Sequence, residues 1–163
     1  SHGLLPNNRT HVFKAYGVYQ VTDEFSVSVN MNIASGTPLS ALGYIPLDGM
    51  LPSVDANDFS GYGASSFYTK DANGNAVLGK RGQEGETPWT YMIDVGASYT
   101  PSWADDNLTV QAQIFNVLNL GKATEFNQQK DLSQDNNAVN PNFLNVTNFQ
   151  VPRSVTLTAR YRF

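Results

Sequence analysis

The chain has 163 residues, of which 15% are charged and 12% aromatic, and its formal net charge at pH 7 is −4. Soluble domains carry about 25% charged residues, so this composition is poor in charge for that class. The acidic balance excludes the basic footprint of a nucleic-acid-binding protein. The absence of cysteine excludes a disulfide scaffold, a thiolate metal site and a cysteine nucleophile.

The hydropathy pattern separates two ways of crossing a membrane. The mean hydropathy is −0.33, and no apolar run approaches the roughly 18 residues of a spanning helix, so transmembrane helices are excluded. Transmembrane β-strands stay open, because they alternate apolar and polar residues. The sequence begins at Ser1 without an initiator Met or signal peptide, although the features described below require an exported protein. We therefore expect the start of the protein to be missing.

Five segments have the period-two alternation of β-strands, and they lie at residues 9–20, 24–35, 89–100, 107–118 and 149–163. Each is close to the 9 to 11 residues that a tilted strand needs to cross the hydrocarbon layer. Strands of globular proteins average about 5 to 6 residues. The lengths favour a membrane β-barrel over a soluble β-protein.

The second and last segments show the alternation most clearly. In the second, the apolar face carries Phe25, Val27, Val29, Met31 and Ile33. In the last, the apolar face carries Val155, Leu157, Ala159, Tyr161 and Phe163. The residues between them are Ser, Asn, Thr and Arg, so each segment has one apolar wall and one polar wall.

The connections alternate in length. The links at residues 21–23 and 101–107 are short, whereas the loops 36–86 and 119–148 are long and rich in Gly, Asn, Ser and Pro. Outer-membrane barrels have short periplasmic turns and long extracellular loops. Five is an odd number of strands, whereas bacterial barrels have even numbers, so we expect the first strand to pair with a part of the barrel outside these residues.

Several motifs, taken in order, resemble the end of TonB-dependent receptors, and most closely the Oar-like subgroup. They are residues 5–14 (LPNNRTHVFK), 35–40 (SGTPLS), 87–91 (TPWTY), 99–101 (YTP), 115–119 (FNVLN) and 152–163. The ordered set covers nearly the whole chain. Each motif alone is weak.

The resemblance implies a 22-stranded barrel that is filled by an N-terminal plug domain. It also implies a TonB box that couples the plug to the inner membrane, so that a scarce ligand is taken up into the periplasm. The plug is absent from these residues, which would supply about a quarter of the barrel wall. The implied partners are the outer-membrane lipid, the plug and remaining strands, TonB and the barrel assembly machinery.

The last strand also carries a candidate assembly signal. Phe163 ends the chain, with Tyr161, Ala159, Leu157 and Val155 on its face. This pattern resembles the C-terminal signal that the barrel assembly machinery reads. The plain alternative is that Phe163 is simply the last lipid-facing residue.

Aromatic residues gather near the strand ends, where amphipathic rings suit the level of the lipid headgroups. The candidate interface residues are Trp89, Tyr91, Tyr99, Trp103 and Tyr19. A sugar-stacking platform at Trp89 is the alternative.

Four charged residues are predicted to face the barrel lumen: Lys14, Asp94, Arg160 and Arg162. They could line a ligand path, or they could pair with neighbouring groups of the wall or the plug. We expect the second role.

The first long loop contains residues 71–75 (DANGN), which have three alternating oxygen ligands of a calcium loop but lack its closing Gly and Glu. Asn-Gly is a strong turn signal, so we predict a hairpin tip there. His2 and His11 are too far from suitable carboxylates to form a metal site. No motif for a catalytic nucleophile or a cofactor is present, and we expect no enzymatic activity.

The sequence therefore predicts an all-β fold, formed by the C-terminal antiparallel strands of a barrel in the bacterial outer membrane. The predicted function is to form the wall and surface loops of a TonB-dependent transporter, with the ligand unknown. One alternative is a structural or adhesion barrel that does not transport. Another is a soluble β-sandwich binding module, which would need no detergent.

Overall fold

The structure is a computed structural model, and it describes residues 3–43, 67–70, 76–132 and 139–163. The chain divides into two compact units. The sheet unit comprises Thr10–Ser35, Trp89–Lys122 and Phe149–Phe163. The loop unit comprises Ser1–Arg9, Gly36–Pro88 and Ala123–Asn148.

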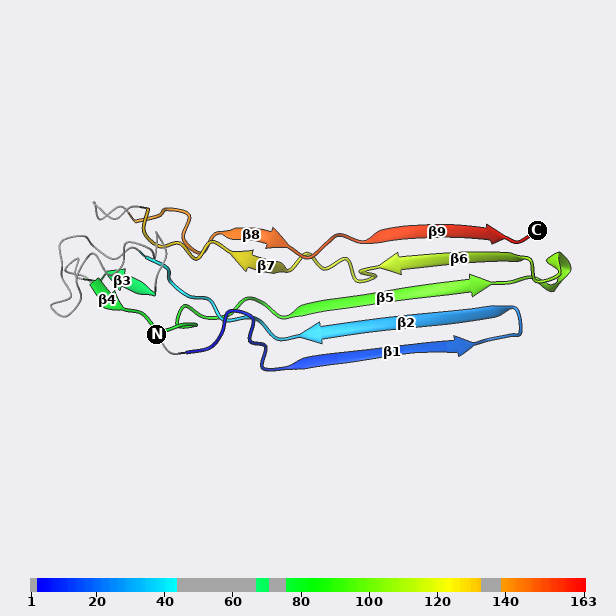
Figure 1. Ribbon diagram of the computed structural model, residues 1–163, viewed down its shortest axis with the longest axis horizontal. Coiled ribbons are helices and arrows are strands. Elements are labelled where there is room, and N and C mark those ends of the chain that lie inside the picture. The colour runs from blue at the N-terminus through cyan, green and yellow to red at the C-terminus, as the bar shows by residue number, and fades with distance from the viewer. Residues whose placement is uncertain (1–2, 44–66, 71–75, 133–138) are drawn as a thin grey trace. The chain divides into compact units, whose positions relative to one another are not determined.

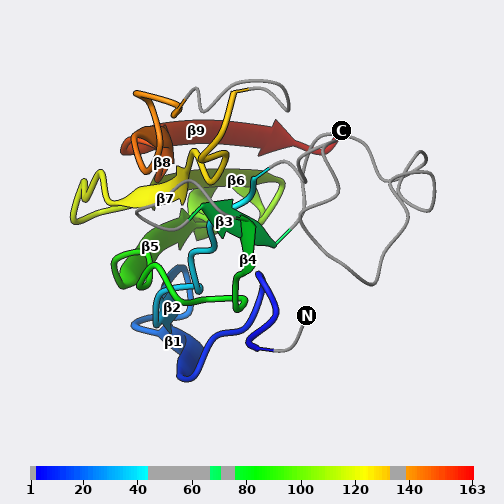
Figure 2. The same cartoon turned by 90° about the vertical axis from the view of Figure 1, so that its left-hand side faces the viewer.

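The sheet unit is one five-stranded antiparallel sheet in the order β1-β2-β5-β6-β9. Its strands are β1 (Val12–Gln20), β2 (Phe25–Ala34), β5 (Thr90–Tyr99), β6 (Leu108–Phe115) and β9 (Ser154–Tyr161). The same order can be followed in two views at right angles (Figures 1 and 2). The predicted all-β fold with antiparallel strands is confirmed.

Short turns join the strands at one end of this sheet. Between β1 and β2, the Val21 N–H donates to the Phe25 carbonyl at 2.9 Å, and the Phe25 N–H donates to the Thr22 hydroxyl at 3.0 Å. Between β5 and β6, the chain forms the 3-10 helix η2 (Ser102–Ala104). Asp105 and Asp106 then take positive φ values of 51° and 59°, which Asp tolerates better than most residues.

All five strands are shorter than the sequence predicts, and at β6 and β9 asparagine side chains capture the backbone beside the strand. β6 ends at Phe115 since Asn116 adopts a φ of 49°, which is not a strand conformation. The predicted last segment, 149–163, is interrupted at residues 150–153. The Val151 carbonyl accepts a hydrogen bond from the Asn116 side chain, and the Arg153 N–H donates to the Asn119 side chain. The Val151 carbonyl and the Arg153 N–H are therefore not available for hydrogen bonds between strands.

The two predicted long loops contain regular structure. In the first, β3 (Tyr68–Lys70) pairs antiparallel with β4 (Ala76–Leu78). The predicted hairpin tip and weak calcium motif, residues 71–75, lie outside the described residues, but the pairing of the strands on either side is what a hairpin requires. In the second, β7 (Ala123–Phe126) pairs with β8 (Val146–Phe149).

The base of the first loop is closed by close backbone contact. The Thr87 N–H donates to the Thr37 carbonyl at 2.9 Å, and the Thr37 N–H donates to the Thr87 hydroxyl at 2.9 Å. A Cβ at Gly36 would lie 1.8 Å from the Thr87 carbonyl oxygen, so only glycine fits there. The segment then pairs with the second loop, because the Lys130 N–H donates to the Leu42 carbonyl.

Buried hydrophobic side chains are scarce. Among the described residues they are Ala34, Leu39 and Ala41, and the last two belong to the loop unit. The described part of the chain has no helix with the length and hydropathy needed to span a membrane.

Candidate functional site

The register of the sheet sorts its side chains into one apolar face and one polar face. Directly opposed residues of an antiparallel pair point to the same side. One row that crosses all five strands is Tyr19, Val27, Ala97, Ala112 and Leu157. The row beside it is Gln20, Ser26, Ser98, Gln111 and Thr158. The alternation read from each strand therefore combines into two continuous surfaces.

The apolar face is not covered by any other part of the sheet unit. On its last strand Val155 is 62% exposed, Leu157 75% and Tyr161 60%. Isolated exposed hydrophobic residues are common on soluble proteins, but a contiguous face of them marks a contact with an apolar phase or a partner. This face is the candidate functional surface of the chain.

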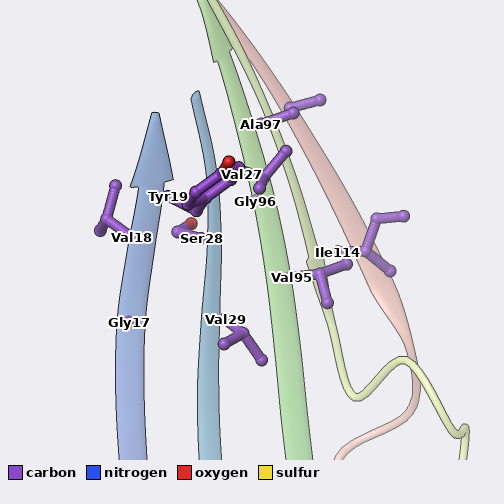
Figure 3. A pocket seen from close by; sticks show the side chains of 11 residues that line it. Gly17, Val18, Tyr19, Val27, Ser28, Val29, Val95, Gly96, Ala97 and Ile114 are labelled. Carbon is purple, nitrogen blue, oxygen red and sulfur yellow. The ribbon is translucent and has the colours of Figure 1, made fainter. Parts of the chain in front are cut away.

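A shallow hollow of about 590 Å³ lies on the apolar face. Its lining includes Gly17, Ala97 and Ala112, which have small side chains or none. Larger side chains border it, among them Val29, Val95 and Ile114, as Figure 3 shows. The hollow is a dip in the apolar face, and its lining is mostly apolar, with Tyr19 and Ser28 as the residues that carry a hydroxyl group.

The predicted interface aromatics fall near the two ends of the strands. Tyr19, Tyr99 and Trp103 lie near the short turns, at the ends of β1 and β5 and in η2. Trp89 directly precedes β5 and Tyr91 is its second residue. From Tyr91 to Tyr99 the strand extends roughly 27 Å at about 3.4 Å per residue. Strands of outer-membrane barrels are tilted by about 35–45°, so this length would span roughly 20 Å of an apolar band that is about 25 Å tall.

Trp89 is partnered within the sheet unit. Its ring stacks on the ring of His11, with 5.9 Å between ring centroids and 17° between planes. His11 directly precedes β1, as Trp89 precedes β5, so the pair ties two strand beginnings together.

The candidate assembly residues line one face of β9. The register places Val155, Leu157, Ala159 and Tyr161 opposite Ile114, Ala112, Val110 and Leu108. Phe163 lies two residues beyond the strand and its side chain is exposed. The geometry leaves this row accessible.

Three of the four predicted lumen residues lie on the polar face of the sheet. Lys14 is opposite Asn32, Asp94 opposite Asn30, and Arg160 opposite Thr109. Arg162 follows β9, and its N–H donates to the Asn107 carbonyl at 2.9 Å. The structure does not gather the four, because they lie in separate rows.

Asn116 is a structural residue whose role the sequence analysis missed. It is 0% exposed and belongs to the FNVLN motif. Its side-chain N–H donates to the carbonyls of Leu120 and Val151 at 3.2 and 2.7 Å. Its backbone N–H donates to an Asp94 carboxylate oxygen at 2.9 Å. The residue thus joins β5, the end of β6 and the entrance to β9. The available signal was its residue type, because Asn adopts positive φ more readily than most residues.

Glu24 ties the two short turns of the sheet unit together. The Ser102 N–H donates to the Glu24 carboxylate at 2.8 Å, and the Thr100 N–H donates to the Glu24 carbonyl at 2.8 Å. Hydrogen bonds from the Ser102 hydroxyl, the Ser102 backbone and the Tyr99 hydroxyl lower the pKa of Glu24, because they favour its charged form.

The loop unit has a recess of its own, of about 450 Å³. Its lining is mostly polar and includes Thr37, Thr87, Glu125 and Gln128, with Phe126 as an aromatic wall. No group of three or more His, Cys, Asp or Glu residues gathers as a metal site in the described ranges.

Comparison with known proteins gives a distant relation. The chain is 25% identical to the TonB-dependent transporter Oar of Myxococcus xanthus over 200 aligned residues. The alignment covers 99% of this chain and 17% of that protein, so the chain spans about a sixth of its relative's length. No family model matches the chain, and no solved structure matches it significantly. The chain is thus distantly related to a TonB-dependent transporter, and that relative is a transport protein rather than an enzyme.

Proposed function

We propose that the chain forms part of the wall and surface loops of a TonB-dependent transporter in the bacterial outer membrane. In this proposal the apolar face contacts lipid and the polar face lines the lumen. The remaining strands and a plug domain belong to other parts of the protein, and TonB energises uptake of a scarce ligand into the periplasm.

The observation that carries the proposal is the uncovered apolar face with a polar face directly behind it. A soluble sandwich buries its inner face against a second sheet about 10 Å away. Here the described residues of the sheet unit supply no second layer, and large apolar side chains such as Leu157 are three-quarters exposed. Exposing apolar side chains to water is unfavourable, but exposing them to lipid hydrocarbon is not. In hydrocarbon the requirement is instead that every backbone N–H and carbonyl group be hydrogen-bonded.

The connections support the same proposal. The two short turns join β1 to β2 and β5 to β6, whereas 55 residues separate Ala34 from Thr90. Barrels of the outer membrane place short turns in the periplasm and long loops outside. We infer that the loop unit faces the cell exterior, where its polar recess is available to a ligand.

The relation to a TonB-dependent transporter supports the energy-coupled form of the proposal over a passive or adhesive barrel. The exposed row that ends in Tyr161 and Phe163 supports recognition by the barrel assembly machinery. Both roles, and the partners they imply, are proposals for the whole protein.

The test is to locate the full-length protein and to measure its dependence on TonB. We expect a heat-modifiable protein in the outer-membrane fraction, extracted only by detergent, whose producing cells lose uptake of its ligand when TonB is deleted. A protein that is released without detergent would contradict the membrane wall. A membrane barrel whose function is unchanged without TonB would agree with the proposed barrel wall but would contradict the proposed energy coupling.

A further inference from the structure

The polar face of the sheet has a recess of about 320 Å³ around Asp94. Two adjacent rows form it. The first runs Tyr16, Asn30 and Asp94 across β1, β2 and β5. The second runs Val18, Ser28, Gly96 and Gln113 across β1, β2, β5 and β6. Phe115 closes the recess on the side of β6.

Gly96 creates the depth of this recess. A Cβ at Gly96 would lie 2.5 Å from the Ser28 hydroxyl oxygen, so the backbone of β5 and the Ser28 side chain are already in contact there. The floor is therefore fixed by backbone and by one hydroxyl, and the taller side chains of Tyr16, Asp94 and Phe115 stand around it.

Asp94 presents a carboxylate to this recess in a fixed orientation. One oxygen accepts the Asn116 N–H at 2.9 Å, and the other accepts the Asn30 side-chain N–H at 3.2 Å. Both are hydrogen bonds from neutral groups, and within the described part of the chain Asp94 forms no ion pair. Since an ionised carboxylate has about four lone-pair sites, it can accept further hydrogen bonds from a cation.

Tyr16 is the neighbouring aromatic residue, and it is placed to contact such a cation on the side away from Asp94. Tyr16 and Asp94 are separated by one strand, and strands lie about 4.8 Å apart, so their backbones are roughly 10 Å apart. That spacing leaves room for one planar group above Asn30. A guanidinium group stacks on an aromatic ring and pairs with a carboxylate, which a spherical cation cannot do equally well.

We propose that this recess binds the guanidinium group of a ligand that reaches the polar face, with Asp94 as the anionic partner and Tyr16 as the stacking surface. The inference rests on the proposed function, because that function makes the polar face a lumen. It adds the chemical class of ligand that the wall recognises.

The experiment is calorimetric titration of the full-length protein in detergent at low ionic strength, with agmatine as the guanidinium probe and 4-aminobutylurea as the control, which keeps the ammonium group of agmatine and replaces its guanidinium by a neutral urea. We expect agmatine to bind and 4-aminobutylurea not to bind. Asp94→Asn keeps an acceptor for the Asn116 N–H but removes the charge, and we expect it to weaken agmatine binding by roughly ten- to a hundredfold.

Two further variants separate recognition from folding. Tyr16 is 83% exposed, so Tyr16→Leu should leave the fold intact and weaken agmatine binding by about two- to fivefold. Asp106→Asn makes the same charge change in the short turn and should leave binding unchanged. The inference is overturned if agmatine does not bind, or if it binds wild type and Asp94→Asn equally well. The heat-modifiable band reports the barrel separately, so that failure is distinguishable from failure of the proposed function.

Discussion

The sheet unit and the loop unit are stabilised in opposite ways. In the sheet unit the backbone is paired strand to strand, but the apolar side chains, Leu157 among them, lie exposed on one face. In the loop unit the strands are short, but Leu39 and Ala41 are buried and Ser40 and Asn140 are buried and hydrogen-bonded. The apolar face of the sheet therefore has no cover within the sheet unit, and the proposed lipid contact would supply one, whereas the loop unit contains a small core of its own.

The largest effect is expected from placing a charge on the apolar face of the sheet. Leu157→Arg places a charge on the apolar face of β9, and if that face contacts lipid the change should lower the free energy of unfolding in lipid vesicles by about 2–4 kcal/mol. Thr158→Arg, on the polar face one residue away, should lower it by less than about 1 kcal/mol. Urea unfolding of the two variants measures the difference. Equal losses would show that the two faces meet the same solvent.

The next largest effect is expected from removing the side-chain hydrogen bonds of Asn116 within the sheet unit. Asn116→Ala removes the side-chain hydrogen bonds to Leu120 and Val151 and puts alanine at a positive φ. We expect a loss of about 2–3 kcal/mol in the free energy of unfolding. Asn119→Ala, at an exposed position with a similar φ of 52°, is the matched control and should lose about half as much. An Asn116→Ala protein as stable as wild type would contradict the stabilising role of the Asn116 hydrogen bonds.

A third change acts on the loop unit alone. Gly36→Ala forces the Thr87 carbonyl to move and should destabilise the base of the loop by about 1–3 kcal/mol. Hydrogen exchange at the Thr37 and Leu39 amides should accelerate, while amides of β5 and β6 keep their protection. Gly121→Ala is the control, because a Cβ there meets nothing within 4 Å. Accelerated exchange throughout the sheet would show that the two units are not independently stabilised.

The smallest expected effect concerns the turns of the sheet. Because the folded pKa of Glu24 is lowered, its hydrogen bonds to Ser102 stabilise the turn above the ordinary glutamate pKa. That stabilisation is lost as the pH falls through the folded value. The amide resonance of Ser102 should report this titration, and Glu24→Gln should abolish it. A Ser102 resonance that titrates equally in the variant would assign the change to another group.

The sequence predicts the sheet well because its information is local. Apolar and polar residues alternate along each strand and so identify its two faces. The assignment of Val27 and Leu157 to the apolar face therefore follows from this alternation alone. The strand ends are less predictable, since they depend on side-chain capture: Asn116 ends β6 and takes the Val151 carbonyl from the entrance to β9.

The loop unit was predicted least well, because its order depends on contacts distant in sequence. Gly36 and Thr87 are 51 positions apart, and the Ser40 N–H finds its acceptor at the Gln128 side chain, 88 positions on. No local period encodes such pairs. The recess around Asp94 was equally hidden. The sequence identified Asp94 as a polar-face residue, but the register was needed to bring Tyr16 and Gly96 beside it.

The most direct measurement is a spin-label scan of β9 in the full-length protein reconstituted into lipid. This chain contains no cysteine, so it adds no competing label, and single cysteines at each position of Ser154–Tyr161 can be labelled individually in a full-length protein whose other cysteines, where present, are replaced by serine. We predict a period of two, with labels at Val155, Leu157, Ala159 and Tyr161 relaxed by oxygen and those between them relaxed by a water-soluble nickel complex. Nickel accessibility at Leu157 and Ala159 equal to that at Thr158 would contradict a lipid-facing wall.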